Sequence, residues 1–209
     1  WHGQSTWFIE SFSPDSKIIS IDIDFTNLKY RSEKAEYLEK DLSSYDWAQI
    51  FKKNEVNPKD VIFVLDDHQS IIDRLKFLSS FGVKHLIYED NYPISQGDCL
   101  SPKKVLGKVD YIIDRGGLRE LIEYEKDLYL TFCNHVSEYI ELPPLFRKEK
   151  TRWGDFWEDD SYPTPEPLVK NEQSKKYPLF FQEALDYTWI CNLATRRIHR
   201  HQIFNRALI

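Results

Sequence analysis

The stretch DVIFVLDDHQSIIDRLKFLSSFGVKHLIYEDN, from Asp60 to Asn91, decides the fold. Its apolar run from Val61 to Leu65 is typical of a central strand that is covered on both faces. The segment SIIDRLKFLSSFG repeats apolar residues at helical spacing and ends at Gly82, a residue type that often stops a helix. VKHLIYED then predicts another strand. Strand, helix and strand at this spacing predict a right-handed crossover between two parallel strands.

The chain before this stretch continues the alternation of strands and helices. KIISIDID and AEYLEKDL predict strands at 17–24 and 35–42, and Ser43-x-x-Asp46 is a capping pattern that predicts a helix. The opening WHGQSTWFIESF predicts a turn at Gly3 and a helix capped by Ser5 or Thr6. Because a strand normally precedes such a loop, we expect the N-terminal strand to be cut off and the chain to be a fragment.

The second half of the chain has a less regular pattern. VDYIIDR predicts a short strand at 109–115, and GLRELIEYEKDLYLTFCNHVSEYI predicts one long helix over 117–140. The segment 141–169 is rich in proline and aromatic residues and predicts an irregular ordered loop. The last strand or strands are expected within 177–198. No domain boundary stands out, so residues 1–209 are predicted to form a single domain.

Composition narrows the classes of protein to consider. A chain of 209 residues that is 41% hydrophobic suits one globular domain. The net charge of −6 argues against nucleic acid as a partner, and the basic TRRIHRHQIFNR near the end fits a solvated tail or edge strand better than a polyanion site. No apolar run is long enough for a membrane span. The three widely spaced cysteines, Cys99, Cys133 and Cys191, argue against a disulfide framework or zinc cluster and favour the reducing cytoplasm.

Acidic residues follow the carboxyl ends of three predicted strands, where open α/β sheets bind their ligands. They are Asp22 and Asp24, Asp66 and Asp67, and Glu89 and Asp90. The last two pairs are expected on neighbouring strands, and converging carboxylates repel one another unless a cation or shared protons neutralise them. Oxygen ligands suit Mg²⁺ or Mn²⁺. Acids are also common at strand ends simply because these ends lie near solvent.

His68 directly follows the second acidic pair. A histidine beside a metal site can act as general base on a bound hydroxyl, whereas a lone histidine is more often a hydrogen-bonded structural residue. The neighbouring acidic residues favour the role of general base for His68.

The segments GQST, IISIDID, EYLEKDL, VIFVLDDHQ and HLIYEDNYP together resemble a known family. Their order and spacing are similar to those of class I S-adenosylmethionine-dependent methyltransferases, and more narrowly to metal-dependent O-methyltransferases of the catechol and the macrolide-sugar or cephalosporin-hydroxylase-like groups. The resemblance covers roughly residues 1 to 105, about half the chain. It implies a Rossmann-like α/β fold with a mostly parallel, doubly wound sheet.

The resemblance also implies roles for individual residues in binding S-adenosylmethionine. Gly3 and Ser5 would line the methionine part of the cofactor. Asp22 would hold the ribose hydroxyls, and Asp41 would lie near the adenine.

The implied metal site uses the two later acidic pairs. Asp66 or Asp67, together with Glu89 and Asp90, would ligate the metal, and His68 would be the base. The family's sugar enzymes place this histidine two residues further on, so the choice between the two aspartates stays open. Asn91 could replace Glu89 if the register follows the catechol pattern.

The implied acceptor is a hydroxyl, ideally one of a vicinal pair that chelates the metal, and sugars and catechols both fit. Trp153, Trp157 and Tyr162 suit stacking on a sugar ring, although they could equally pack the loop onto the domain. We favour a sugar or glycan. The chain also resembles the methyltransferase part of a larger glycan-assembly protein of viral type, which would place it in host cytoplasm.

Two other classes of function compete with this interpretation. Asp22-x-Asp24 after an apolar strand is the Mn²⁺-binding pattern of nucleotide-sugar glycosyltransferases, although it leaves DDHQ and EDNYP unexplained. A Rossmann-like binding module without catalysis is the third alternative. Nothing in the sequence predicts the oligomeric state.

Overall fold

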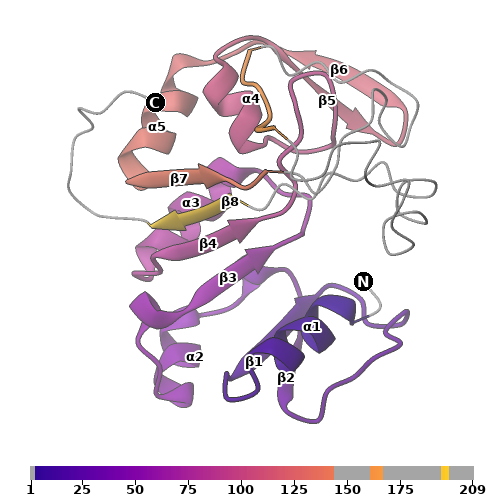
Figure 1. Ribbon diagram of the computed structural model, residues 1–209, viewed down its shortest axis with the longest axis vertical. Helices are drawn as coiled ribbons and strands as arrows, with labels where there is room; N and C mark the ends of the chain where they lie inside the picture. Colours follow the sequence, from indigo (N-terminus) through magenta and orange to yellow (C-terminus); the bar gives the residue numbers. More distant parts are fainter. Residues whose placement is uncertain (1–2, 144–160, 167–193, 198–209) are drawn as a thin grey trace. The chain divides into compact units, whose positions relative to one another are not determined.

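The computed structural model describes residues 3–143, 161–166 and 194–197 (Figure 1). The chain has a mixed α/β structure and divides into two compact units, residues 1–55 and 56–209. Each unit is described by itself. Among the described helices, none combines the length and the apolar character that crossing a membrane requires.

The first unit contains a two-stranded parallel sheet and two helices. Its elements are α1 (Gln4–Phe12), β1 (Ile18–Asp22), β2 (Ala35–Glu39), the 3-10 turn η1 (Leu42–Ser44) and α2 (Trp47–Asn54). The two predicted strands are confirmed and pair in parallel, with Ile18 opposite Ala35. The indole of Trp47 is buried and donates a 3.0 Å hydrogen bond to the Leu42 carbonyl, which ties α2 to the turn before it.

Both predicted helix caps in this unit are wrong in detail. The carboxylate of Asp46 caps α2 by accepting from the backbone N–H groups of Ala48 and Gln49, because it lies one residue before the helix. Ser43 lies earlier, inside η1. At α1 the capping residue is Gly3, without a side-chain hydrogen bond, so neither Ser5 nor Thr6 caps this helix.

The second unit contains the predicted crossover. β3 (Ile62–Leu65) and β4 (His85–Tyr88) pair in parallel and are joined by α3 (Ile71–Ser80). The predicted apolar face of α3 is confirmed, since Ile71, Leu75 and Leu78 are fully buried. The helix stops as predicted, because Gly82 takes a φ of +83° that other residues rarely adopt.

The strand β3 is covered less than its sequence predicts. Phe63 and Leu65 are buried, but Ile62 is 60% exposed and Val64 is 44% exposed. The burial therefore alternates, and the prediction that both faces of this strand are covered is wrong. A continuous apolar run cannot by itself distinguish a strand covered on two faces from one covered on a single face.

Two later strands complete a four-stranded sheet. β7 (Glu138–Glu141) and β8 (Ala194–Arg197) give the order β3-β4-β8-β7, in which β8 is antiparallel to both neighbours (Figure 1). β8 confirms a strand within 177–198, and the rest of that range lies outside the described residues. The sheets are thus parallel at β1–β2 and β3–β4 and antiparallel at β8.

The single long helix predicted over 117–140 is wrong. The structure has a hairpin of β5 (Tyr111–Arg115) and β6 (Leu118–Ile122), then α5 (Lys126–His135) and β7. Gly116 and Gly117 both take positive φ and form the hairpin turn. The apolar residues of β6 recur at helical spacing, but pairing with β5 across this turn decides its structure.

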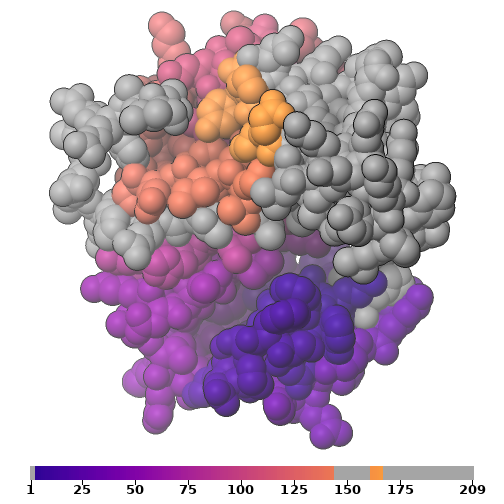
Figure 2. All heavy atoms as spheres, viewed as in Figure 1, coloured from indigo at the N-terminus to yellow at the C-terminus, as the bar shows by residue number. Residues whose placement is uncertain are grey.

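A short described segment, 161–166, lies beside the second unit's sheet. The Tyr162 ring lies 6.2 Å from that of Tyr139 in β7, and the Tyr162 carbonyl accepts from the buried ammonium of Lys103 in α4 (Pro102–Gly107). Figure 2 shows the atoms of 161–166 in orange next to the salmon atoms of the β7 region. Trp153 and Trp157 lie outside the described residues.

Candidate metal-binding site

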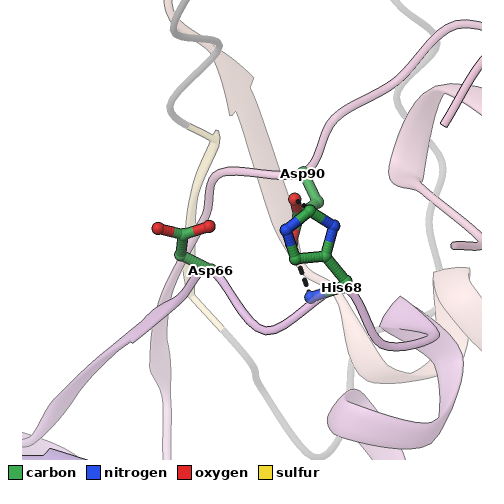
Figure 3. A group of neighbouring side chains, drawn as sticks. All are labelled: Asp66, His68 and Asp90. Carbon is green, nitrogen blue, oxygen red and sulfur yellow. Dashed lines mark hydrogen bonds and ion pairs between the residues drawn. The ribbon is translucent and has the colours of Figure 1, made fainter. Parts of the chain in front are cut away.

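The end of β3 and the end of β4 bring three chemically useful side chains together. Asp66 follows β3 directly, His68 comes two residues later, and Asp90 lies just after β4. Because the two strands are parallel neighbours, their carboxyl ends lie at one edge of the sheet. Figure 3 shows the three side chains converging from these two loops.

The group has the dimensions of a metal site. One ligand atom from each of Asp66, His68 and Asp90 lies within 4.8 Å of the other two. The donor set is two carboxylate oxygens and one imidazole nitrogen, which suits a divalent cation such as Mn²⁺ or Mg²⁺. Asp66 and His68 are exposed and Asp90 is buried, so a cation could reach the group from solvent.

Asp90 is the buried anchor of the site. The residue is 1% exposed, and its Oδ1 has no hydrogen-bond partner within the part of the chain that the structure describes. Burial raises the pKa of Asp90 to about 6; the charges of Asp66 and Asp67 act in the same direction, and His68 opposes them. A buried carboxylate oxygen without a hydrogen bond is an energetically costly group that a bound cation would stabilise.

His68 is held in place through both its backbone and its ring. Its backbone N–H donates to Asp90 Oδ2 at 3.0 Å, and its φ of +53° is unusual for a residue other than glycine. Its ring Nδ1 lies 3.0 Å from Asp98 Oδ1 and 3.6 Å from Asp90 Oδ1. The ring is therefore within hydrogen-bond distance of Asp98 and close to the charge of Asp90.

The surrounding charges also set the protonation of His68. Burial alone would lower the pKa of His68, but the hydrogen bond to Asp98 and the charges of Asp90, Asp98 and Asp66 outweigh it and raise the pKa above its ordinary value. The imidazole is therefore held closer to its cationic form while no metal is bound.

Three residues expected among the ligands lie outside this group of three. Asp67 accepts from Arg74 Nε at 2.8 Å and from the Gln69 backbone N–H at 3.3 Å, so it anchors the loop to α3. Asn91 is buried; its Oδ1 accepts from the Lys103 backbone N–H and its Nδ2 donates to the Tyr139 hydroxyl. Glu89 continues the strand pairing by donating its backbone N–H to Leu65 at 2.9 Å.

Asp98 is a member of the site that the sequence did not reveal. It lies in the loop between β4 and α4, away from every strand end, in the segment SQGDC. No spacing rule connects such a loop residue with His68, thirty positions earlier. Only the path of the folded loop brings it to the imidazole.

The four residues expected to bind S-adenosylmethionine all lie in the first unit. A Cβ atom on Gly3 would lie 2.2 Å from the Tyr30 carbonyl oxygen, so the chain's own packing already requires glycine there. Ser5 is exposed, and Asp41 caps η1 by accepting from the Ser43 backbone N–H. Asp22 ends β1 and is half-buried.

The carboxylates of the competing Asp22-x-Asp24 pattern take part in local turns. Asp22 accepts from the Asp24 backbone N–H at 3.2 Å, and Asp24 accepts from the backbone N–H and hydroxyl of Thr26 at 2.7 and 2.9 Å. The backbone hydrogen bond from Thr26, followed by that from its hydroxyl, lowers the pKa of Asp24. These contacts are those of an Asx turn, a common way for aspartate to organise a loop.

Comparison of the chain with protein-family models, with curated protein sequences and with solved structures found no match.

Proposed function

We propose that this protein is an S-adenosylmethionine-dependent O-methyltransferase that uses a divalent metal to orient a sugar or glycan hydroxyl. The observation that carries the proposal is the grouping of Asp66, His68 and Asp90 at the carboxyl ends of two adjacent parallel strands. This is the edge at which α/β sheets bind ligands, and it is where the resemblance in sequence expects the metal.

The two parallel strand pairs are compatible with the Rossmann-like fold that the resemblance implies. In the second unit β3 and β4 are parallel, and β8 is inserted antiparallel between β4 and β7. The first unit supplies a helix followed by two parallel strands, which agrees with the segments that carry the resemblance in sequence.

The chemistry requires activation of the acceptor. A sugar hydroxyl is too weak an acid to ionise at neutral pH, so the metal, a base or both must help to remove its proton. We assign Asp66 and Asp90 as metal ligands, in preference to Asp67 and Glu89, because these two join the group of three. His68 is then either the third ligand or the general base.

The residues expected to bind S-adenosylmethionine remain Gly3, Ser5, Asp22 and Asp41. The preference for a sugar acceptor rests on Trp153, Trp157 and Tyr162 in the segment 141–169, of which residues 141–143 and 161–166 are described. There the Tyr162 ring lies near the Tyr139 ring. This position agrees with packing of the segment onto the domain as well as with stacking on a sugar ring. A cytoplasmic location agrees with the free thiols of Cys99 and Cys133.

Calorimetric titration tests the proposed function most directly. S-adenosylmethionine should bind, Mn²⁺ should bind at one site, and methyl transfer to a panel of sugars should stop in EDTA and recover with Mg²⁺ or Mn²⁺. A UDP-sugar titrated under the same conditions serves as the competing ligand. Binding of the UDP-sugar without binding of S-adenosylmethionine would overturn the proposal in favour of a glycosyltransferase.

The His68→Ala variant separates the two roles of the histidine. As the base, its loss should lower turnover by roughly 10²–10⁴-fold while Mn²⁺ affinity stays the same. As a ligand, its loss should weaken Mn²⁺ binding itself. Turnover and Mn²⁺ affinity both within a few-fold of wild type would exclude the histidine from the reaction.

A further inference from the structure

We propose that Asp98 is a positioning residue that receives the Nδ1–H of His68, so that Nε2 is the nitrogen presented to the metal or the acceptor. The identity of the group that Nε2 contacts, a metal or an acceptor hydroxyl, rests on the proposed function. The orientation of the ring can be tested independently of that function. No sequence pattern assigns Asp98 to a site.

The geometry around the ring favours Asp98 as the partner of Nδ1. The distance of 3.0 Å to Asp98 Oδ1 is that of a hydrogen bond, whereas the 3.6 Å to Asp90 Oδ1 exceeds one. Figure 3 shows the opposite ring nitrogen, Nε2, on the side of the imidazole that faces Asp66. A histidine that ligates a metal through one nitrogen commonly donates the other N–H to a carboxylate, which fixes the tautomer and the orientation of the ring.

The loop that carries Asp98 is anchored on both sides of this residue. The ammonium of Lys104 donates to the carbonyl of Gly97 at 3.1 Å and to that of Cys99 at 2.8 Å. Lys104 is completely buried. The Gly97 carbonyl also accepts from the Asp114 backbone N–H at 3.0 Å, so the backbone flanking Asp98 is tied to α4 and β5.

Close packing further restricts the same loop. Gly97 has a φ of +77°, and a Cβ atom added there would lie 2.1 Å from the Tyr92 ring. An isolated, exposed His–Asp pair contributes little, because two mobile side chains must be ordered to form it. Here the backbone of Asp98 is already held, so less ordering is needed to present its carboxylate to His68.

The first experiment reads the ring directly in the protein without metal. ¹⁵N NMR of labelled histidine, in EDTA at about pH 9 where an ordinary imidazole is neutral, should show His68 as the Nδ1–H tautomer. In Asp98→Ala the ring should change to a majority of the Nε2–H tautomer, the form that histidine prefers without such a partner. An Nε2–H tautomer in the wild type, or no change in the variant, would overturn the proposal.

The second experiment measures Mn²⁺ affinity by electron paramagnetic resonance. With His68 as a metal ligand, Asp98→Ala should bind Mn²⁺ about 10- to 100-fold more weakly, as expected for loss of a partner that orients a ligand. Asp98→Asn keeps a carbonyl oxygen that can accept the Nδ1–H, so its Mn²⁺ affinity should fall less. Asp127→Ala, which removes the same charge from an exposed position in α5, is the matched control and should stay within twofold of wild type.

The two experiments distinguish failure of the inference from failure of the proposed function. Wild-type protein that does not bind Mn²⁺ argues against the proposed metal site, while the tautomer measurement still decides the role of Asp98. Where His68→Ala shows the histidine to be a ligand, wild-type binding together with unchanged affinity in Asp98→Ala overturns the inference alone. Where it shows the histidine to be the base, the tautomer measurement decides the inference. Far-ultraviolet circular dichroism should show all variants folded, because the Asp98 side chain is 37% exposed.

Discussion

Asp90 shows how one residue can be costly to the fold and useful to a site. It lies just after β4 and is almost fully shielded from water. Its Oδ2 accepts the His68 backbone N–H, while its Oδ1 has no hydrogen bond from any described residue. A carboxylate in this environment resists ionisation, and this predicts a measurable dependence of stability on pH.

We predict that Asp90 destabilises the metal-free protein as the pH rises through its titration. Burial raises the pKa of Asp90 from 3.8 to about 6, so the native state holds a proton that the unfolded state has released between these values. The free energy of unfolding is therefore highest, as far as Asp90 is concerned, below pH 4, and this contribution is lost as the pH rises to 6. At neutral pH the loss is about 3 kcal/mol, an upper figure for roughly two pKa units.

Urea denaturation in EDTA checks this prediction. Asp90→Asn should be close to wild type in free energy of unfolding near pH 4 and more stable than wild type near pH 7. Asp127→Asn, at an exposed position, is the charge-matched control and should not become more stable than wild type near pH 7. A difference between Asp90→Asn and wild type that does not depend on pH would contradict the assignment of a raised pKa.

At the scale of elements, two glycines share a left-handed backbone conformation but differ in how closely their surroundings pack against them. Gly82 follows α3 with a φ of +83°, and among the described residues a Cβ atom there would meet only Pro58, at 3.7 Å. Gly97 has a φ of +77° in the loop before α4, where a Cβ atom would overlap the Tyr92 ring. The backbone strain of a substitution is similar at the two sites, but the steric cost is not.

We therefore predict that Gly82→Ala costs about 1–2 kcal/mol, the usual penalty of a left-handed residue with a side chain, and that Gly97→Ala costs more. Gly97→Ala should also weaken Mn²⁺ binding, because Asp98 is its neighbour, whereas Gly82→Ala should not. Thermal denaturation and Mn²⁺ titration of both variants measure these effects. Equal losses of stability would show that Tyr92 moves aside without cost.

At the scale of the whole molecule, the proposed function uses residues from both compact units. Asp22 lies in the first unit and Asp66 in the second. We predict that Asp22→Ala weakens S-adenosylmethionine binding by about 1–3 kcal/mol, the scale of lost charge-assisted hydrogen bonds, and leaves Mn²⁺ affinity unchanged. Asp66→Ala should weaken Mn²⁺ binding and leave S-adenosylmethionine affinity unchanged. The rate of methyl transfer should fall in both variants.

Calorimetry with each ligand separately tests this pair of variants. S-adenosylmethionine affinity that is unaffected by Asp22→Ala would remove Asp22 from the cofactor site. Loss of both affinities in either variant would indicate a folding defect, which the free energy of unfolding would reveal.

Local pattern was sufficient to predict the crossover over residues 60–91. Apolar periodicity predicted β3, α3 and β4, their parallel pairing and the stop at Gly82, because these features depend on residues close together in the chain. The same reasoning failed for 117–140, where helical spacing competes with a two-glycine turn and pairing with β5 decides the result. Propensity is a weak guide when a neighbouring strand is available.

The sequence alone was also enough to bring Asp66 and Asp90 to one edge of a sheet, since the carboxyl ends of parallel neighbours always meet there. It could not decide between adjacent residues such as Asp66 and Asp67, because the direction of a loop side chain depends on what it contacts. In the folded chain Asp67 forms an ion pair with Arg74. A loop anchored by buried Lys104 brings Asp98 within hydrogen-bond distance of His68. These choices belong to the tertiary structure because they depend on where the folded helix α3 and the folded loop place their side chains, and for Asp98 and His68 on a contact across thirty positions of the chain.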